Sequence, residues 1–174
     1  ATDDYIFVID NDYNKVHIHR NDVAMAGPRT FEELGRISDI DLYRVASKGD
    51  YLFTADGWPG ELIVYDISNP ATPVLVNIAP LHADVSNGEM KIVDNYLLIA
   101  KGAGGSTTYP EAYVFDISSP TNPLYVGGFF SEGVGGYGID FIDGKFIVAF
   151  GSQAEEGSFS GNWDGFGRIE VYGE

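Results

Sequence analysis

Two segments of this chain are near copies of one another. Residues 61–78 and residues 111–128 are identical at eight of eighteen positions and lie fifty residues apart. Their shared part is Asp-Ile-Ser-x-Pro-x-x-Pro, which begins at Asp66 and again at Asp116. A fixed period of this length is the signature of a repeat architecture, in which one supersecondary unit is copied along the chain. The repeat therefore constrains the fold far more than it constrains the function.

Short apolar runs with the same plan occur four times, each entered through a turn residue. They cover residues 4–9, 50–55, 95–100 and 144–149. Such a run is expected in a strand that is buried on both faces. A further candidate strand follows each run, at residues 15–19, 61–65, 111–115 and 168–172.

The remaining strands complete the repeat. An inner strand is predicted before three of the apolar runs, at residues 42–46, 89–93 and 138–142. An outer strand is predicted at residues 31–37, 74–78 and 124–129, and Leu34-Gly35 of the first lines up with Val126-Gly127 of the last. Residues 30–33 could instead form a helix capping box, but the run is too short for us to prefer a helix. Four antiparallel strands in about 45 residues is the plan of a β-propeller blade.

We therefore predict an all-β fold made of β-propeller blades. A single propeller, or a propeller fragment, would span residues 1–174, with repeats at about 1–40, 41–85, 86–135 and 136–174. The first repeat lacks an inner strand and the last lacks an outer strand, so the predicted strand counts are three, four, four and three. Exposed edge strands are an aggregation hazard. We expect the chain to belong to a larger or incompletely closed ring, or to self-associate through its open edges. A minimal four-bladed domain with irregular closure is the alternative.

The repeated motif itself is typical of a turn. Asp66 and Asp116 can accept backbone N–H bonds in Asx-type turns. The prolines of the motif fix φ and remove donors where the chain leaves the third strand of each repeat; they are Pro70, Pro73, Pro120 and Pro123. We interpret both aspartates as structural residues and not as catalytic ones.

At residues 96–127, the chain reads Tyr-Leu-Leu-Ile-Ala and then Val-Phe-Asp-Ile-Ser-Ser-Pro-Thr-Asn-Pro-Leu-Tyr-Val-Gly. This pattern resembles the LVIVD repeat. The resemblance covers residues 43–130 and extends less closely over 137–150, whereas His19-Arg20-Asn21 replaces the motif near the start. It implies a propeller in an exported bacterial or archaeal surface protein, with a scaffold or interaction role and no catalytic residues.

The composition excludes several classes of function. The chain has 10 basic and 26 acidic residues, a formal net charge of −16, and this balance disfavours binding to nucleic acid or to an anionic membrane surface. No apolar run is long enough to span a bilayer, so we expect no membrane insertion. The absence of cysteine removes disulfides, thiolate metal sites and cysteine nucleophiles. The acidity is typical of a soluble exported or salt-adapted protein, and divalent-cation binding is the alternative.

Aromatic side chains gather on the loops that propeller geometry would bring to one face. The candidate ligand-binding residues on this face are Trp58, Tyr109, Trp163, His82 and Asp84. Aromatic residues on irregular loops are typical of binding surfaces. The alternative is that each tryptophan merely fills its own glycine-rich loop.

One turn has oxygen donors at alternate positions, as in the front of a calcium loop. The donors are Asp10, Asp12 and Asn14. The later glycine and the bidentate glutamate of a full EF-hand are missing, and hairpin turns also favour Asp and Asn. Calcium is the only cofactor that the sequence suggests.

Three other patterns are less specific. His17 and His19 lie on the same side of one strand, but no third zinc ligand is obvious, and their alignment with Ile63 and Tyr65 favours packing or surface placement. His82, Asp84 and the nearby Ser86 are close in sequence, which is no indication of triad geometry. Residues 102–108 are glycine-rich but lack the lysine and the helix of a phosphate-binding loop.

We predict a non-enzymatic interaction or structural module, located outside the cell or on its surface, with a protein or glycan partner. A filament, sheath or surface-layer component is one form that it could take. The first alternative is a lectin-like module that stacks sugars on Trp58, Tyr109 and Trp163. The second alternative is a metal-dependent hydrolase domain that uses the acidic loops.

Overall fold

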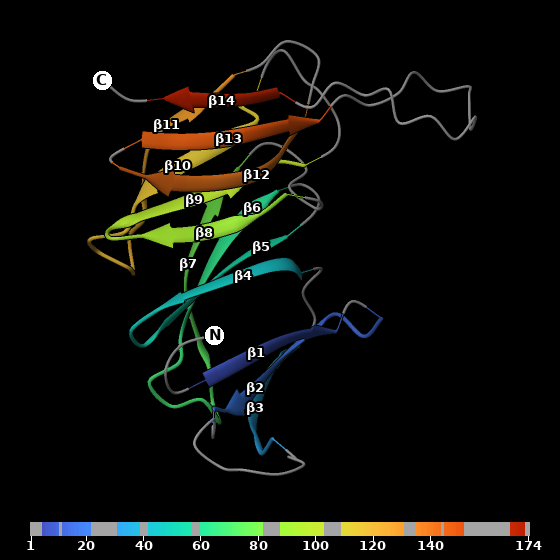
Figure 1. The fold of residues 1–174 in the computed structure, drawn as a ribbon. Coiled ribbons are helices and arrows are strands. Elements are labelled where there is room, and N and C mark those ends of the chain that lie inside the picture. The colour runs from blue at the N-terminus through green and yellow to red at the C-terminus, as the bar shows by residue number, and fades with distance from the viewer. Residues whose placement is uncertain are drawn as a thin grey trace, which may run out of the picture.

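A computed structural model describes ten segments of the protein, all of them built around β-strands. These segments are residues 5–10, 12–21, 31–38, 42–56, 60–81, 88–102, 109–130, 135–143, 145–151 and 168–172. Within them, fourteen strands form four antiparallel sheets that follow one another in sequence order (Figure 1). No helix of the described residues is long and apolar enough to cross a membrane.

The four sheets contain three, four, four and three strands, as the repeat predicts. The first sheet consists of β1 (Tyr5–Asp10), β2 (Lys15–Arg20) and β3 (Glu33–Ser38). The second consists of β4 (Leu42–Lys48), β5 (Tyr51–Asp56), β6 (Glu61–Asp66) and β7 (Val74–Pro80). The third consists of β8 (Met90–Val93), β9 (Tyr96–Ala100), β10 (Ala112–Asp116) and β11 (Leu124–Phe129). The fourth consists of β12 (Gly135–Ile142), β13 (Lys145–Gly151) and β14 (Arg168–Tyr172).

The same β-bulge marks the outer part of the first three sheets. The extra residue lies in the outer strand, opposite the step that follows Ile18 in β2, Val64 in β6 and Val114 in β10. The partners of these three residues on the outer strands are Gly35, Asn77 and Gly127, respectively. Because the register and the bulge agree, these three outer-strand residues occupy one equivalent position in the repeat. The strand predicted at residues 31–37 is confirmed as β3.

The core lies between the sheets. Alternation along each strand sends neighbouring side chains to opposite faces. In β6, Ile63 and Tyr65 pack toward the first sheet, whereas Leu62 and Val64 pack toward the third. The equivalent alternation continues to the last junction, where Leu98 packs with residues of the fourth sheet. The apolar runs predicted to be buried on both faces are confirmed in β5 and β9.

The blades form an open ring. At the inner side, β1 packs beside β4, β4 beside β8, and β12 beside β8 and β9. The first and fourth sheets lie at opposite ends of this row (Figure 1). Among the described residues, no strand pairs with the outward edge of β1 or of β14. The fold is therefore a set of β-propeller blades in a ring that is not closed.

The repeated motif forms the turns that its residues predict. The backbone N–H of Ser68 donates to Asp66 Oδ1, and that of Ser118 donates to Asp116 Oδ1, both at 2.8 Å. The bonds from the serine backbone and side chain hold the pKa of each aspartate below its usual value. The Asx-type turns predicted at Asp66 and Asp116 are confirmed.

Candidate functional site

The outward face of the first sheet differs chemically from the equivalent faces of the second and third sheets. In those two sheets the third strand turns a pair of large buried side chains toward the preceding sheet: Ile63 with Tyr65, and Tyr113 with Phe115. His17 pairs with Val8 of β1 in the same register in which Ile63 pairs with Thr54 of β5. His17 and His19 therefore take the positions of the two large side chains.

The histidines point away from the second sheet. Val16 and Ile18, their neighbours on β2, are fully buried in the cluster between the first and second sheets. Alternation places His17 and His19 on the opposite face. The two histidines therefore lie at the surface, which is one of the two placements that the sequence favoured over a zinc site. Val8, which lies beside His17, is 46% exposed.

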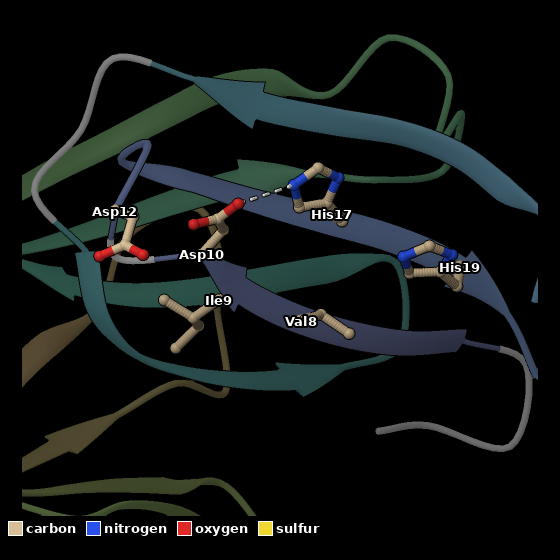
Figure 2. Close-up of a pocket in the computed structure, with 6 residues that line it drawn as sticks. All are labelled: Val8, Ile9, Asp10, Asp12, His17 and His19. Carbon is tan, nitrogen blue, oxygen red and sulfur yellow. Dashed lines mark ion pairs between the residues drawn. The ribbon is translucent and has the colours of Figure 1, made fainter.

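A hollow of about 530 Å³ lies on this face. It is lined by Val8, Ile9, Asp10, Asp12, His17 and His19 (Figure 2). We call these residues, together with Glu33, the first-sheet face. The rings of His17 and His19 stack, with centroids 6.1 Å apart and an interplanar angle of 24°. The Nδ1 of His19 is buried and makes no hydrogen bond within the described part of the chain.

His17 lies between two carboxylates. Its Nε2 is 3.9 Å from Asp10 Oδ2, and its Nδ1 is 3.2 Å from Glu33 Oε2 (Figure 2 shows the first pair). Arg36 Nε lies 2.9 Å from the other oxygen of Glu33. Burial opposes ionisation of Glu33, but the hydrogen bond from His17 and the charge of Arg36 outweigh it, so the pKa of Glu33 is lowered. The face can both accept and donate hydrogen bonds, and it carries acidic groups.

The predicted calcium residues form a hairpin turn. The backbone N–H of Tyr13 donates to the carbonyl of Asp10 at 3.4 Å. Asn14 has a φ of 51°, in the left-handed region that asparagine tolerates. No group of three or more His, Cys, Asp or Glu side chains is placed to hold a metal ion among the described residues. The turn alternative thus accounts for the backbone at Asp10, Asp12 and Asn14, and calcium binding stays a prediction.

The predicted ligand-binding loops are largely outside the described residues. Trp58, His82, Asp84 and Trp163 fall outside them. Tyr109 is described and is 40% exposed, just before β10. A shared binding face for the five residues stays a prediction.

A buried ion pair within the third sheet was not predicted. Lys101 Nζ lies 3.7 Å from Glu111 Oε1, and the two side chains are only 4% and 0% exposed. The backbone N–H of Lys101 donates to the carbonyl of Glu111 at 2.8 Å, which joins the end of β9 to the start of β10. The equivalent of Lys101 in the second sheet is Asp56, whose Oδ1 accepts the backbone N–H of Glu61 at 2.6 Å. The change from an acidic to a basic residue at this position of the repeat is the sequence signal that could have indicated the pair.

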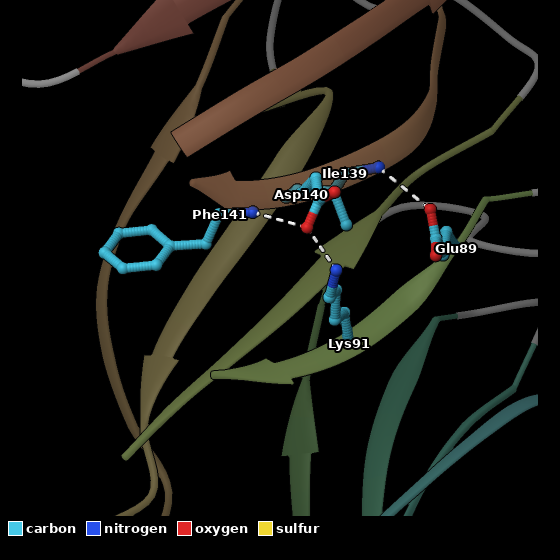
Figure 3. Close-up of polar contacts among 5 residues, drawn as sticks. All are labelled: Glu89, Lys91, Ile139, Asp140 and Phe141. Atoms are coloured by element: carbon cyan, nitrogen blue, oxygen red, sulfur yellow. Dashed lines mark hydrogen bonds and ion pairs between the residues drawn. The ribbon is translucent and has the colours of Figure 1, made fainter. Parts of the chain in front are cut away.

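A polar link joins the inner strands of the third and fourth sheets, β8 and β12. Lys91 Nζ contacts Asp140 Oδ1, and the backbone N–H of Phe141 donates to the same oxygen at 2.7 Å (Figure 3). Glu89 Oε2 accepts the backbone N–H of Ile139 at 3.1 Å. The bond from Lys91, followed by that from Phe141, lowers the pKa of Asp140. Sequence patterns missed this link because it depends on how two sheets sit against each other.

The second sheet corresponds to one copy of a known repeat. Residues 41–79 match the LVIVD repeat. This segment runs from the start of β4 almost to the end of β7, and the resemblance inferred from the motif is confirmed there. LVIVD repeats are associated with β-propellers, in agreement with the four-stranded sheet that the segment forms.

No curated protein sequence matches the chain significantly. Among solved structures, the chain is similar to the one titled "Crystal Structure of the N-terminal Domain of Nup159", with a TM-score of 0.43 and 13% sequence identity. The match covers 95% of this chain and 57% of that one.

Proposed function

We propose that the chain is a non-enzymatic interaction module that works outside the cell or on its surface and binds a protein partner through the first-sheet face. The observation that carries the proposal is the replacement of two large buried side chains by His17 and His19 at equivalent positions of the repeat. At the same positions, the third strands that pack against a preceding sheet carry large apolar or aromatic side chains. A face with stacked imidazoles and carboxylates suits a contact that remains hydrated.

The charges of the first-sheet face favour a partner with basic or hydrogen-bond-donating groups. Asp10, Asp12 and Glu33 carry negative charge around the hollow, and the formal net charge of the chain is −16. Complementary charge speeds encounter and disfavours acidic competitors. The extracellular setting is supported by the resemblance to LVIVD repeats and by the acidic composition.

Site-specific photocrosslinking in the cells that produce the protein tests this proposal. A photoreactive residue at Val8, which is exposed in the hollow, should give an adduct of one discrete mass, whereas the same residue at the exposed Leu124 of β11 should not. Asp10→Lys should remove the adduct because it reverses one of the charges, and Asp50→Lys, in the exposed turn before β5, is the matched control. Equal adducts at Val8 and Leu124 would contradict the proposal. Protease treatment of intact cells tests the location, because only a surface protein is digested.

A further inference from the structure

The outer strand of one sheet contacts the proline turn of the next sheet at the first two junctions. Gly35 of β3 lies directly against the turn that follows β6: a Cβ added at Gly35 would be 1.9 Å from the carbonyl oxygen of Pro70 and 3.0 Å from Ala71 Cα. Real Cβ atoms do not approach backbone oxygen so closely, so only glycine fits this contact. The turn of the second sheet thus closes the outer end of the junction with the first.

The second junction repeats this contact with different chemistry. Asn77 of β7 occupies the position equivalent to Gly35, and its Nδ2 donates to the carbonyl of Thr121 at 3.0 Å. Thr121 follows Pro120 in the motif, as Ala71 follows Pro70. The same part of the Asp-Ile-Ser-x-Pro-x-x-Pro turn therefore meets the same position of the preceding outer strand at both junctions.

The equivalent position is open at the third junction. Gly127 of β11 pairs with Val114 as Gly35 pairs with Ile18, but a Cβ added at Gly127 would meet no atom of the described residues within 4 Å. This openness is local, because a Cβ at the next residue, Gly128, would lie 2.6 Å from a side-chain carbon of Pro110. Gly127 is the point where a turn from a following blade would sit.

A groove of about 510 Å³ occupies that point. Its lining is mostly apolar and includes Val93, Tyr96, Val126, Gly127, Phe141 and Phe146. Val126 is 50% exposed and Tyr96 is 42% exposed. The fourth sheet ends at β14, whose outward edge is unpaired among the described residues. In the second and third sheets, the strand that follows the proline turn pairs with the edge equivalent to this one.

We propose that this groove binds an Asp-Ile-Ser-x-Pro-x-x-Pro turn of a repeat-bearing segment outside residues 1–174, and that the strand following the turn pairs with β14. The turn is rigid before it binds, since its prolines fix φ and its aspartate caps a backbone N–H, so little ordering entropy opposes docking. Strand addition to an unpaired sheet edge supplies main-chain hydrogen bonds, and the apolar groove supplies selectivity for the turn. The site is independent of the first-sheet face, which lies at the other end of the row of sheets.

A second folded copy of this chain does not fit this site as well. Its two motif turns are already in use, because one packs on Gly35 and the other contacts Asn77. Either turn would have to leave its own junction before it could bind. The occupant that fits the groove is therefore a motif that is not already packed within a blade of this chain.

A synthetic peptide with the sequence of residues 66–80 provides the probe, because it carries both the turn and the following strand. A fluorescent form of this peptide, titrated with the whole protein, should show saturable binding by anisotropy. A scrambled peptide should not bind, and a peptide with Pro70→Ala and Pro73→Ala should bind at least about tenfold more weakly, since the turn is then not preformed. Equal binding of the original and scrambled peptides, or no binding of either, would overturn the proposal.

Two substitutions at one position distinguish the groove from any other site. Gly127→Leu should leave the melting temperature unchanged, because the added side chain enters open space, and should weaken peptide binding by at least about tenfold through overlap with the turn. Gly127→Asn is the matched control and should retain binding, because Asn77 holds the turn at the equivalent position. Unchanged affinity in Gly127→Leu would place the peptide elsewhere and refute the proposal.

Hydrogen exchange and sedimentation complete the test. Amides of β14 should become protected when the peptide binds, and binding without such protection would refute the strand pairing. The protein alone should sediment as one species over a wide concentration range. Self-association that Gly127→Leu abolishes would show that a second copy occupies the groove, against the proposal.

Discussion

The junction between the second and third sheets and the junction between the third and fourth solve the same packing problem differently. Large side chains such as Phe53, Leu97 and Tyr113 fill the former with a buried apolar cluster. The latter has a cluster around Ile139 and Val148, which polar links accompany. At its outer end, the second-to-third junction is closed by a motif turn, whereas the third-to-fourth junction has an open groove.

The difference shows how the contacts between two sheets change when the neighbouring sheet has three strands in place of four. Between the two four-stranded sheets, the apolar cluster and the turn contact are accompanied by hydrogen bonds from cationic side chains to uncharged acceptors. Arg44 donates to the carbonyl of Gly88, and Lys48 donates to the carbonyl of Asp94. Where the next sheet has three strands, the cation meets a carboxylate instead: Lys91 of β8 pairs with Asp140 of β12. Ionic links respond to salt, pH and loss of one partner, whereas apolar packing responds mainly to loss of volume. The two junctions should therefore fail under different perturbations.

The largest effect is expected from Phe53→Ala at the second-to-third junction. Phe53 is fully buried in the apolar cluster, and its truncation should lower the free energy of unfolding by about 3–5 kcal/mol through lost burial and the cavity left behind. Urea unfolding followed by fluorescence measures the loss, which should not depend on salt. Val74→Ala, at an exposed position of β7, is the control and should change little. A loss below about 1 kcal/mol for Phe53→Ala would mean that this junction does not depend on apolar packing.

The next effect is expected from Lys101→Met at the end of β9, where the following residue, Gly102, donates its backbone N–H to Gly136 of the fourth sheet. The substitution keeps most of the volume but leaves Glu111 buried without its cation, which should cost about 3 kcal/mol at neutral pH. Unlike Phe53→Ala, this variant should recover stability when the pH is lowered, because Glu111 can then take up a proton. The double variant Lys101→Met, Glu111→Leu should regain most of the loss at pH 7. If the double variant is no more stable than the single one, the two charges do not act as a pair.

The sequence predicted those features of both junctions that depend on the order of residues within one repeat. Apolar runs gave the strands, including the short count in the first and last sheets, and the spacing of Asp66 and Pro70 gave the turns. Aligning the repeats placed His17 and His19 opposite Ile63 and Tyr65. These predictions succeed because each depends on period, turn chemistry or copy number within one repeat.

The contacts between elements needed the structure. Glu33 lies close to His17 because a bulge at Leu34 in β3 brings Glu33 opposite His19. Lys101 and Glu111 meet only when β9 pairs with β10, and the groove at Gly127 depends on how one sheet sits against the next. The alignment of Leu34-Gly35 with Val126-Gly127 held a signal for the groove, but nothing in the sequence showed that Gly35 touches a turn.

A smaller effect is expected on acidification, at the turns of the closed junctions. The pKa values of Asp66 and Asp116 are lowered by the bonds from Ser68 and Ser118, so their stabilising effect is fully present above the ordinary aspartate value of 3.8 and is lost as the pH falls through the lower folded values. Asp66→Asn with Asp116→Asn keeps an oxygen acceptor and removes the titration. This variant should lose less stability than the wild type between pH 5 and about pH 2 in urea-unfolding measurements. An identical acid dependence would assign the acid sensitivity to other carboxylates.

The smallest effect is expected from Lys91→Ala at the inner side of the third-to-fourth junction. The bridge to Asp140 is partly exposed, and such pairs contribute little because water and salt screen them. Its removal should nevertheless make the stability of the protein less dependent on sodium chloride between about 0.05 and 1 M, since one screened attraction is gone. Lys145→Ala, at an exposed position of β13 for which no bridge is seen among the described residues, is the matched control. If both variants keep the salt dependence of the wild type, the bridge does not hold the two sheets together, and the third-to-fourth junction depends on its small apolar cluster and on the bond from Ile139 to Glu89.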